Sequence, residues 1–278
     1  MKLPALATQG NRIVNRDSRE PVLLRGVNRS GLEYGAQIPQ EDIRRIVAEW
    51  NSNIIRIPFI QDKALNSEEY RKSLDDVIEW AAGLGAYTLL DLQWLDTTQK
   101  IAPLPDFETP RLWRMLAERY RGQPHVLYDL YNEPHDCRAE DWQYWARLLT
   151  DTIREVHPDS LIFISGIDWG YNLRDVPFDG PNLVWSTHVY RWKPLPWAVA
   201  FGHLAPDVPV YAAEWGGGGD DLQWGRELAD YFNSLQMGWT AWSWSDYPHL
   251  QMDGEVTPFG ELVRAELATP RQIVINRD

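Results

Sequence analysis

Glu133 and Glu214 are the residues of this sequence whose type and setting point most directly to chemistry. Residues 126–134 read Val-Leu-Tyr-Asp-Leu-Tyr-Asn-Glu-Pro, and residues 208–216 read Val-Pro-Val-Tyr-Ala-Ala-Glu-Trp-Gly. Each run is typical of a short buried strand that ends at breaker residues. A carboxylate at the mouth of a buried strand is costly unless a site uses it. Two such carboxylates that face each other are what retaining glycoside hydrolysis requires, so we expect a polysaccharide hydrolase.

The rest of the chain alternates apolar runs with amphipathic stretches, the pattern of βα units around a parallel sheet. Eight strands, spaced by roughly 25 to 40 residues, are predicted to end near Asn28, Pro58, Leu92, Asn132, Ser165, His188, Glu214 and Trp244. Helix-period apolar faces cover Gln40–Trp50, Glu68–Leu84, Thr109–Tyr120, Ala139–His157, Leu222–Gln236 and Phe259–Leu267. Two shorter helices are predicted at Asn172–Val176 and Leu195–Leu204.

Ahead of this pattern, Arg12–Val14 and Val22–Leu24 predict a β-hairpin. No linker, charge block or low-complexity stretch divides the chain. We therefore predict one α/β domain over residues 1–278, a (β/α)8 TIM barrel of ~250 residues preceded by a short N-terminal β-hairpin.

The barrel explains how the two glutamates could meet. They are 81 positions apart, which is three βα units of about 27 residues each. They therefore follow the fourth and seventh strands, which face each other across the barrel. Their carboxyls can then come within about 5–5.5 Å, the separation of the retaining mechanism. Mutual repulsion favours a proton on one of them, which raises its pKa into the working range.

Other polar residues fall at the C-terminal ends of the predicted strands, where such barrels carry their catalytic groups.

The ordered motifs resemble glycoside hydrolase family 5, in clan A of the barrel glycosidases, over almost the whole chain. The resemblance rests on Asn-Glu-Pro at 132–134 and Glu-Trp-Gly at 214–216. It extends to Arg-Gly-Val-Asn at 25–28, Asn-Ile-Ile-Arg-Ile-Pro at 53–58, His-Val-Tyr at 188–190, Trp-Ser-Trp-Ser-Asp at 242–246 and Thr-Pro-Phe-Gly-Glu-Leu at 257–262.

The resemblance implies a role for each matching residue. Glu133 would be the general acid and then the general base, and Glu214 the nucleophile. Asn132 would hydrogen-bond the sugar 2-hydroxyl, a contact that strengthens in the transition state. The remaining roles go to residues beside these: Arg56 and Tyr190 would hold Glu214, His188 would lie beside the acid/base and the reacting sugar, and Trp242 would be the platform under that sugar.

One position departs from the family pattern. Asp-Leu-Gln at 91–93 puts Gln93 where many members have a histidine. Glutamine donates and accepts hydrogen bonds but carries no charge near neutral pH. The two-glutamate mechanism is unaffected, whereas the transfer of substrate preference from other members is put in doubt. Aromatic residues in the loops after the strands could line an open cleft for several sugar units: Tyr34, Trp94, Trp169, Trp192, Trp215 and Trp244.

Composition limits the partners. The net charge of -13 and pI of about 4.9 argue against nucleic acid, which demands a basic face. An acidic surface also favours a neutral substrate, and no apolar stretch approaches the ~20 residues of a membrane span. We expect a polysaccharide or oligosaccharide substrate, no nucleic-acid or membrane partner, and a monomer.

No cofactor or metal is predicted. The six histidines include no His-x-His or His-Glu-x-x-His spacing. The glycines at 216–219 precede Asp220 and Asp221, which would repel a phosphate, so we predict a turn there. Cys137 is the single cysteine, which excludes a disulfide within the chain. The apolar stretch at the start of the chain is too short for a signal peptide and is interrupted by proline. We expect export, with the signal peptide absent from this sequence, while a cytoplasmic location stays open.

The specificity is open between related activities. The short loops favour an open cleft and internal attack, so an endo-β-1,4-glucanase, or cellulase, comes first. An endo-β-1,4-mannanase or an exo-acting or transglycosylating β-glycosidase comes next, since glucan and mannan differ only at C2. A non-catalytic oligosaccharide-binding barrel is the remote alternative, because a binding protein is expected to have lost one glutamate and both are present.

Overall fold

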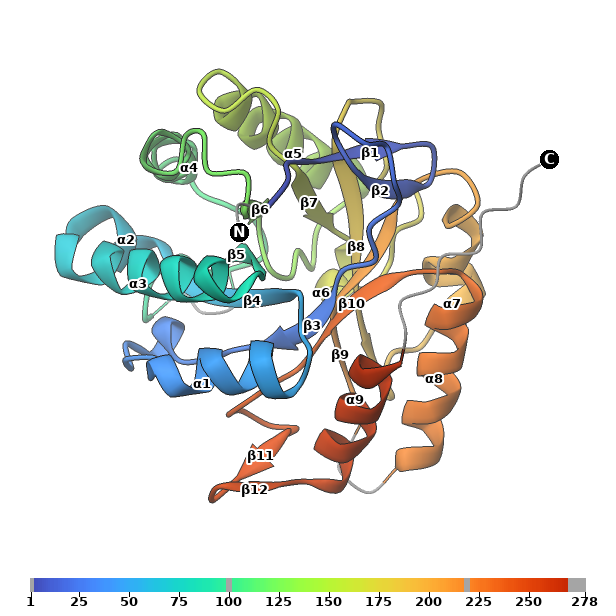
Figure 1. Ribbon diagram of the computed structural model, residues 1–278. Coiled ribbons are helices and arrows are strands. Elements are labelled where there is room, and N and C mark those ends of the chain that lie inside the picture. Colours follow the sequence, from blue (N-terminus) through green and yellow to red (C-terminus); the bar gives the residue numbers. More distant parts are fainter. Residues whose placement is uncertain (1–2, 99–101, 218–220, 270–278) are drawn as a thin grey trace.

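The computed structural model describes residues 3–98, 102–217 and 221–269, so Gly218, Gly219 and Asp220 of the predicted turn lie outside it. Eight parallel strands close into a barrel in the order β10-β3-β4-β5-β6-β7-β8-β9, with helices around its outside (Figure 1). The predicted (β/α)8 barrel is confirmed. The strands are β3 (Arg25–Asn28), β4 (Ile54–Ile60), β5 (Tyr87–Trp94), β6 (Val126–Asp129), β7 (Ile162–Ser165), β8 (Leu183–Tyr190), β9 (Val210–Gly216) and β10 (Gly238–Ala241).

The long helices follow the predicted ranges. α3 spans Glu68–Leu84 as predicted, because Ser67 caps its first turn by accepting from the Tyr70 N–H and Gly85, with φ of 91°, ends it. The other helices are α1 (Gln40–Arg44), continued by the π-helical η2 (Arg45–Glu49), α2 (Gln61–Asn66), α4 (Thr109–Arg119), α5 (Ala139–Arg154), α7 (Trp197–Ala200), α8 (Leu222–Ser234) and α9 (Pro258–Ala268), with short 3-10 turns η1 (Leu32–Tyr34) and η3 (Gly202–Leu204).

The predicted helix at Asn172–Val176 is wrong. The helical turn after β7 is α6 (Ile167–Gly170), and it lies earlier in the loop. Asp168 and Trp169 within it have left-handed backbone angles, which residue patterns do not signal. Asn172 instead donates its backbone N–H to the Ile167 carbonyl at 2.9 Å and closes the loop.

The N-terminal hairpin exists but is shifted by one strand. β1 (Leu6–Gln9) pairs antiparallel with β2 (Arg12–Asn15), whereas Arg12–Val14 and Val22–Leu24 were the predicted partners. The latter pairing is reduced to an isolated bridge between Val14 and Pro21 and one bond from the Val22 N–H to the Ile13 carbonyl. Pro21 lacks an N–H, so a regular ladder cannot continue there.

Two predicted strand ends lie beyond the regular ladder. β6 ends at Asp129 rather than Asn132, and β10 at Ala241 rather than Trp244. Backbone bonds still tie both extensions to the barrel, since Asn132 donates to the Leu92 carbonyl and Trp244 to the Asn28 carbonyl. After β10 the chain forms a small hairpin, β11 (Gln251–Met252) with β12 (Glu255–Val256).

The barrel interior changes character along its axis. One apolar cluster of inward-facing residues, including Ile54, Leu89 and Leu127, fills the end near the hairpin. Two residues further along the same strands stand Arg56, Asp91 and Asp129, all with 0% exposure. Because residues two apart in a strand share a face, the apolar layer is followed by a charged layer. A larger apolar cluster lies between the strands and the helices. In the described part of the chain, no helix is both long and apolar enough to span a bilayer.

Candidate active site

A cleft with a volume of about 960 Å³ opens at the C-terminal ends of the barrel strands. Its wall brings together both glutamates and several residues of the loops after β7, β8 and β10. The lining residues are Gln93, Glu133, Asp168, Trp169, Arg174, Tyr190, Trp192, Lys193, Pro194, Leu195, Glu214, Trp242, Tyr247 and Pro248.

Glu214 lies within β9 and is held at both carboxylate oxygens. Arg56 Nη1 donates to Oε1 at 2.8 Å, and the Tyr190 hydroxyl donates to Oε2 at 2.6 Å. The Glu214 side chain is 5% exposed. A carboxylate whose two oxygens are both fixed by donors is oriented to act as a nucleophile.

Arg56 also holds carboxylates other than that of Glu214. Its Nε donates to Asp129 Oδ2 at 2.9 Å and its Nη2 lies 2.9 Å from Asp91 Oδ1. Burial works to lower the pKa of Arg56, but the carboxylates of Asp91, Asp129 and Glu214 raise it above the ordinary value, so the guanidinium stays charged. Burial in turn raises the pKa of Asp91 and of Asp129, and Arg56 opposes that rise.

Asn132, the residue before Glu133, is held by the same guanidinium. Its Oδ1 accepts from Arg56 Nη2 at 3.0 Å, and Asn28 Oδ1 accepts from Nη1 at the same distance. With Oδ1 turned toward Arg56, the amide N–H groups of Asn132 are the part left to donate to a ligand. This orientation suits the predicted contact with a sugar hydroxyl.

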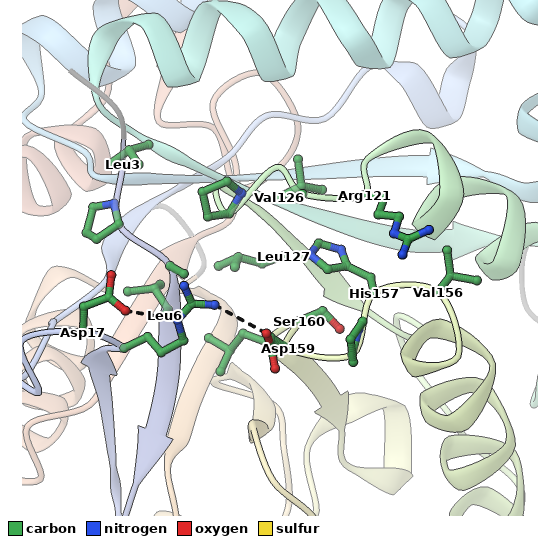
Figure 2. Close-up of a pocket in the computed structure, with 17 residues that line it drawn as sticks. Leu3, Leu6, Asp17, Arg121, Val126, Leu127, Val156, His157, Asp159 and Ser160 are labelled. Atoms are coloured by element: carbon green, nitrogen blue, oxygen red, sulfur yellow. Dashed lines mark hydrogen bonds and ion pairs between the residues drawn. The ribbon is translucent and has the colours of Figure 1, made fainter.

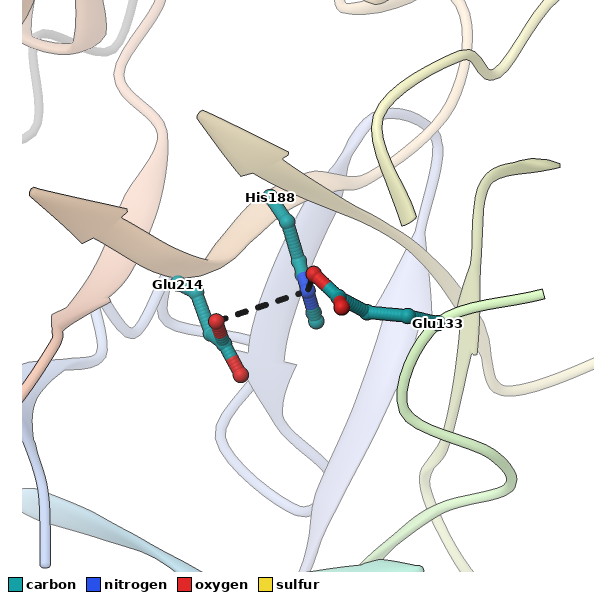
Figure 3. Close-up of side chains that lie close together, drawn as sticks. All are labelled: Glu133, His188 and Glu214. Carbon is teal, nitrogen blue, oxygen red and sulfur yellow. Dashed lines mark hydrogen bonds and ion pairs between the residues drawn. The ribbon is translucent and has the colours of Figure 1, made fainter. Parts of the chain in front are cut away.

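Glu133 lies in the loop after β6, and His188 on β8 reaches its carboxyl (Figure 3). His188 Nδ1 is 3.0 Å from Glu133 Oε1 and 3.6 Å from Glu214 Oε2. Burial lowers the pKa of His188 to about 3, although Glu214 opposes the change. The imidazole is therefore neutral near pH 7 and can hydrogen-bond Glu133 without holding it permanently ionised.

Glu133 is suited to exchange a proton. Burial raises the pKa of Glu133, while the nearby Lys193, Arg56 and His135 work against the rise. The side chain is 24% exposed, whereas Glu214 is 5% exposed. The two glutamates thus stand in different environments, the arrangement that separates an acid from a nucleophile.

The separation of the two carboxyls distinguishes the mechanisms. Ligand atoms of Glu133, His188 and Glu214 all lie within 4.8 Å of one another. Inverting enzymes need about 6.5–9.5 Å between carboxyls to admit a water, whereas retaining enzymes need about 5–5.5 Å. The observed spacing fits retention. An ion could reach these three atoms by distance, but the carboxylates are committed to bonds with Arg56, Tyr190 and His188, so we assign no metal.

Aromatic platforms flank the pair. Trp242 is 8% exposed in the cleft wall and donates its Nε1–H to the Tyr247 carbonyl at 3.0 Å. Trp192 stacks on Tyr190 at 4.7 Å and 14° yet is 64% exposed. Trp169 stacks on His135 at 3.6 Å and 9° and is 39% exposed. Each of the last two has one face supported and another open to a ligand.

The prediction that Trp215 and Trp244 line the cleft is wrong. Trp215 is fully buried and packs against Phe232, Trp239 and Phe259. Because side chains alternate along a strand, the neighbour of inward-facing Glu214 must point toward the helices. Trp244 is 3% exposed and packs edge-on against Trp50.

Of three further residues predicted for the cleft, one lines it and two do not. Tyr34 and Trp94 form an edge-on pair at 5.1 Å, outside the residues that line the cleft. Tyr34 is 54% exposed and donates to Asp246 Oδ2 at 2.8 Å. Gln93 does line the cleft, and its Oε1 is buried with no hydrogen-bond partner in the described residues.

Sequence reasoning missed several residues of the site. Asp91 and Asp129 lie side by side on β5 and β6, and an acidic residue inside an apolar run was the signal that could have found them. Asp168, Arg174 and Lys193 line the cleft from loops, and no residue pattern marks them.

A second cavity, of about 590 Å³, lies at the other end of the barrel, between the N-terminal hairpin and the loops before β6 and β7 (Figure 2). Arg16 pairs there with Asp17 and Asp159 at 3.3 and 3.5 Å. This end of a barrel serves stability, whereas catalytic groups belong to the opposite end. The candidate active site is therefore the cleft around Glu133 and Glu214.

Comparisons with known proteins agree with this geometry. The family model for Cellulase (glycosyl hydrolase family 5) matches residues 16–248. Endoglucanase MaCel5A of Microbulbifer sp. is 24% identical, in a match that covers 85% of this chain and 50% of that protein. An endoglucanase of Paenibacillus polymyxa is 27% identical, in a match that covers 85% of this chain and 78% of that protein. The chain spans only 50% to 57% of the length of several of the curated relatives that it matches.

A solved structure shows the same fold. The β-glucanase SdGluc5_26A from Saccharophagus degradans, in complex with cellotetraose, matches with a TM-score of 0.83 at 23% identity. The match covers 96% of this chain and 94% of that one.

Proposed function

Because this chain belongs to glycosyl hydrolase family 5, the cellulase family, we propose that it is a retaining, endo-acting glycoside hydrolase that cleaves β-1,4-linked glucan. The observation that carries the proposal is the pair Glu133 and Glu214, of which one carboxylate oxygen each lies within 4.8 Å of the other. That separation leaves no room for an inverting water between carboxyl and sugar and places one carboxylate for direct attack.

In the first step, a Glu214 oxygen attacks the anomeric carbon and the glycosidic C–O bond breaks. Glu133 gives its proton to the departing oxygen, and a glycosyl ester of Glu214 forms. Arg56 and Tyr190 orient the attacking carboxylate through bonds of 2.8 and 2.6 Å. Burial, which raises the pKa of Glu133, keeps the proton available for transfer at working pH.

In the second step, Glu133 is a carboxylate and takes a proton from water. The resulting hydroxide attacks the anomeric carbon, the ester bond breaks, and Glu214 leaves as a carboxylate. Two inversions give net retention. His188 Nδ1, 3.0 Å from Glu133 Oε1, lies beside this carboxyl in both steps, and the ring is neutral because burial lowers its pKa to about 3.

The cleft favours a chain over a single sugar. Trp192 and Trp169, 64% and 39% exposed, each offer an open ring face beside the catalytic pair. Several of the relatives are named endoglucanases, and the structurally similar β-glucanase holds cellotetraose. These observations support a β-glucan as the substrate.

Reducing-sugar release from carboxymethyl-cellulose, mixed-linkage β-glucan, glucomannan, galactomannan and xylan tests the proposal, each beside Glu214→Gln. Release from the glucans that is lost in the variant supports the full proposal. Release from mannans alone keeps the mechanism and changes the substrate to β-1,4-mannan. No release of reducing sugar from any polymer or from cello-oligosaccharides would refute hydrolysis. Binding measurements would then test whether the protein is a non-catalytic oligosaccharide-binding barrel.

A further inference from the structure

A left-handed turn at Asp168–Gly170 lies in the cleft, and the mechanism above does not use it. Asp168, Trp169 and Gly170 have φ values of 57°, 62° and 73°. A bulky residue such as tryptophan is a genuine outlier in this region. Such a conformation persists only where the surrounding structure over-determines it, and it concentrates at functional sites.

Lys193, from the loop after β8, holds this turn. Its ammonium donates to the Trp169 carbonyl at 2.7 Å and to the Asp168 carbonyl at 3.3 Å. The Nζ also lies 5.9 Å from the ring centre of Tyr171. One side chain thus ties the loop after β8 to the loop after β7.

The turn supports the backbone that carries Glu133. The Trp169 N–H donates to the Pro134 carbonyl at 3.0 Å, and the Trp169 ring stacks on His135 at 3.6 Å. His135 Nδ1 in turn lies 2.8 Å from the Glu133 carbonyl oxygen. Pro134 and His135 are the two residues directly after Glu133, so a shift of the turn would move Glu133 as well.

The turn also packs on the imidazole that bonds the Glu133 carboxyl. A Cβ added at Gly170 would lie 2.8 Å from both Cγ and Nδ1 of His188. Such a distance is shorter than carbon contacts allow, so the bare glycine backbone lies against the ring. Since His188 Nδ1 is 3.0 Å from Glu133 Oε1, the turn restrains the carboxyl from its other side.

Lys193 acts on Glu133 by charge as well. Burial raises the pKa of Glu133, and Lys193 is the strongest of the cations that lower it. Burial lowers the pKa of Lys193 itself, whereas Glu133, Glu214 and Asp168 raise it. The ionisable groups that act on or bond Glu133 come from several elements: Lys193 after β8, Arg56 on β4, His135 in its own loop, His188 and Tyr190 on β8, and Glu214 on β9.

We propose that Lys193 is a positioning residue for Glu133: its ammonium clamps the left-handed turn that braces Glu133 and His188, and its positive charge acts on the Glu133 carboxyl. The name acid/base for Glu133 rests on the proposed function. The structural claim, that Lys193 governs the ionisation and placement of Glu133, can be tested without catalysis.

The test is a carboxyl ¹³C NMR titration of glutamate-labelled protein, in which the signal lost in Glu133→Gln identifies Glu133. Lys193→Gln keeps an N–H donor for the two carbonyls but loses the charge. We expect it to raise the titration midpoint of Glu133, because the cation that works against the effect of burial is removed. Lys193→Arg, which keeps the charge, should stay close to wild type. Arg174→Gln removes a cation from the same cleft wall but not one that acts on Glu133. In this variant the titration midpoint of Glu133 should not move.

Kinetics adds a second readout. General-acid catalysis needs protonated Glu133, so loss of the nearby cation moves the alkaline limb of kcat/KM on cello-oligosaccharides to higher pH. Lys193→Met, which also releases the turn, should lower kcat by up to about 100-fold. A dinitrophenyl cellobioside, whose leaving group needs no proton, should show no shift in that limb.

An unchanged midpoint in Lys193→Gln, or an equal shift in Arg174→Gln, would overturn the assignment. If Lys193→Met does not fold, Lys193→Gln and Lys193→Arg still decide it, because both keep a donor for the turn. If the wild type cleaves no substrate, the proposed function fails, while the titration still decides the role of Lys193.

Discussion

Arg56 Nη1 lies 2.8 Å from Glu214 Oε1, and the two side chains are 0% and 5% exposed. The same guanidinium pairs with Asp91 and Asp129, each at 2.9 Å. One cation therefore serves three buried carboxyl groups, one of which is the proposed nucleophile. Removing one partner of such a network leaves charge buried without compensation, which costs more than the network contributes against an apolar core.

We expect Arg56→Met to destabilise the protein by about 3–5 kcal/mol at pH 7. Urea unfolding measures the loss. The difference should shrink at lower pH, because protonated aspartates need no cation. Arg44→Met is the matched control, since Arg44 pairs with Glu41 and Glu49 on the exposed surface and its removal should leave the midpoint almost unchanged. Equal losses in both variants would show that the buried network has no special weight.

Glu214→Gln should reduce turnover on the order of 10⁴- to 10⁶-fold, as loss of an attacking group does elsewhere. The amide keeps the shape of the carboxylate but cannot form the glycosyl ester. Initial rates on the preferred glucan and a thermal unfolding curve would be measured together. An active variant with a native unfolding curve would place the nucleophile on another residue.

Glu133→Ala should separate the two chemical steps. A dinitrophenyl glycoside, whose leaving group departs without a proton, should still react in the first step and then stall as the glycosyl ester. A burst of nitrophenolate followed by a slow steady state is expected, and added azide should speed the second step. An equal loss of first-step rate on activated and natural substrates would contradict the acid/base role.

His188 should make stability depend on pH. Burial lowers its pKa to about 3, whereas the unfolded chain takes up this proton near pH 6.5. The unfolded state then binds the extra proton as pH falls, so stability falls from about pH 6.5 toward pH 3. Between pH 7 and pH 5 the loss due to His188 is about 2 kcal/mol.

The comparison is wild type against His188→Gln, each unfolded with urea at both pH values. Opposing contributions from Asp91 and Asp129 are common to both proteins, so their difference isolates His188. We expect the variant to lose about 2 kcal/mol less over this interval. Parallel curves would mean that the imidazole is protonated in the folded state.

Exhaustive dialysis against EDTA should leave the rate unchanged. Glu133, His188 and Glu214 are close enough to contact one ion, but the two-step displacement needs both carboxylates for carbon and proton chemistry. A rate that falls with the chelator and returns with one particular divalent ion would require a different mechanism.

Much of this protein follows from local sequence pattern. The alternation of apolar runs and amphipathic stretches predicted the barrel, because strand and helix periods are imposed by backbone geometry on nearby residues. The spacing of Glu133 and Glu214 predicted their approach, since three βα units between them place them on strands that face each other across the barrel. Trp215 could also have been placed correctly, because a strand residue next to inward-facing Glu214 must point outward.

Other features were decided only when distant segments met. Pairing between β5 and β6 sets Asp91 beside Asp129, and closure of the barrel brings Arg56 to both. The left-handed turn at Asp168–Gly170 depends on Lys193, more than twenty residues further along the chain. Register, ring stacking and the charge around Glu133 arise from contacts between separate elements, and a local pattern carries no information about which partner a side chain will meet.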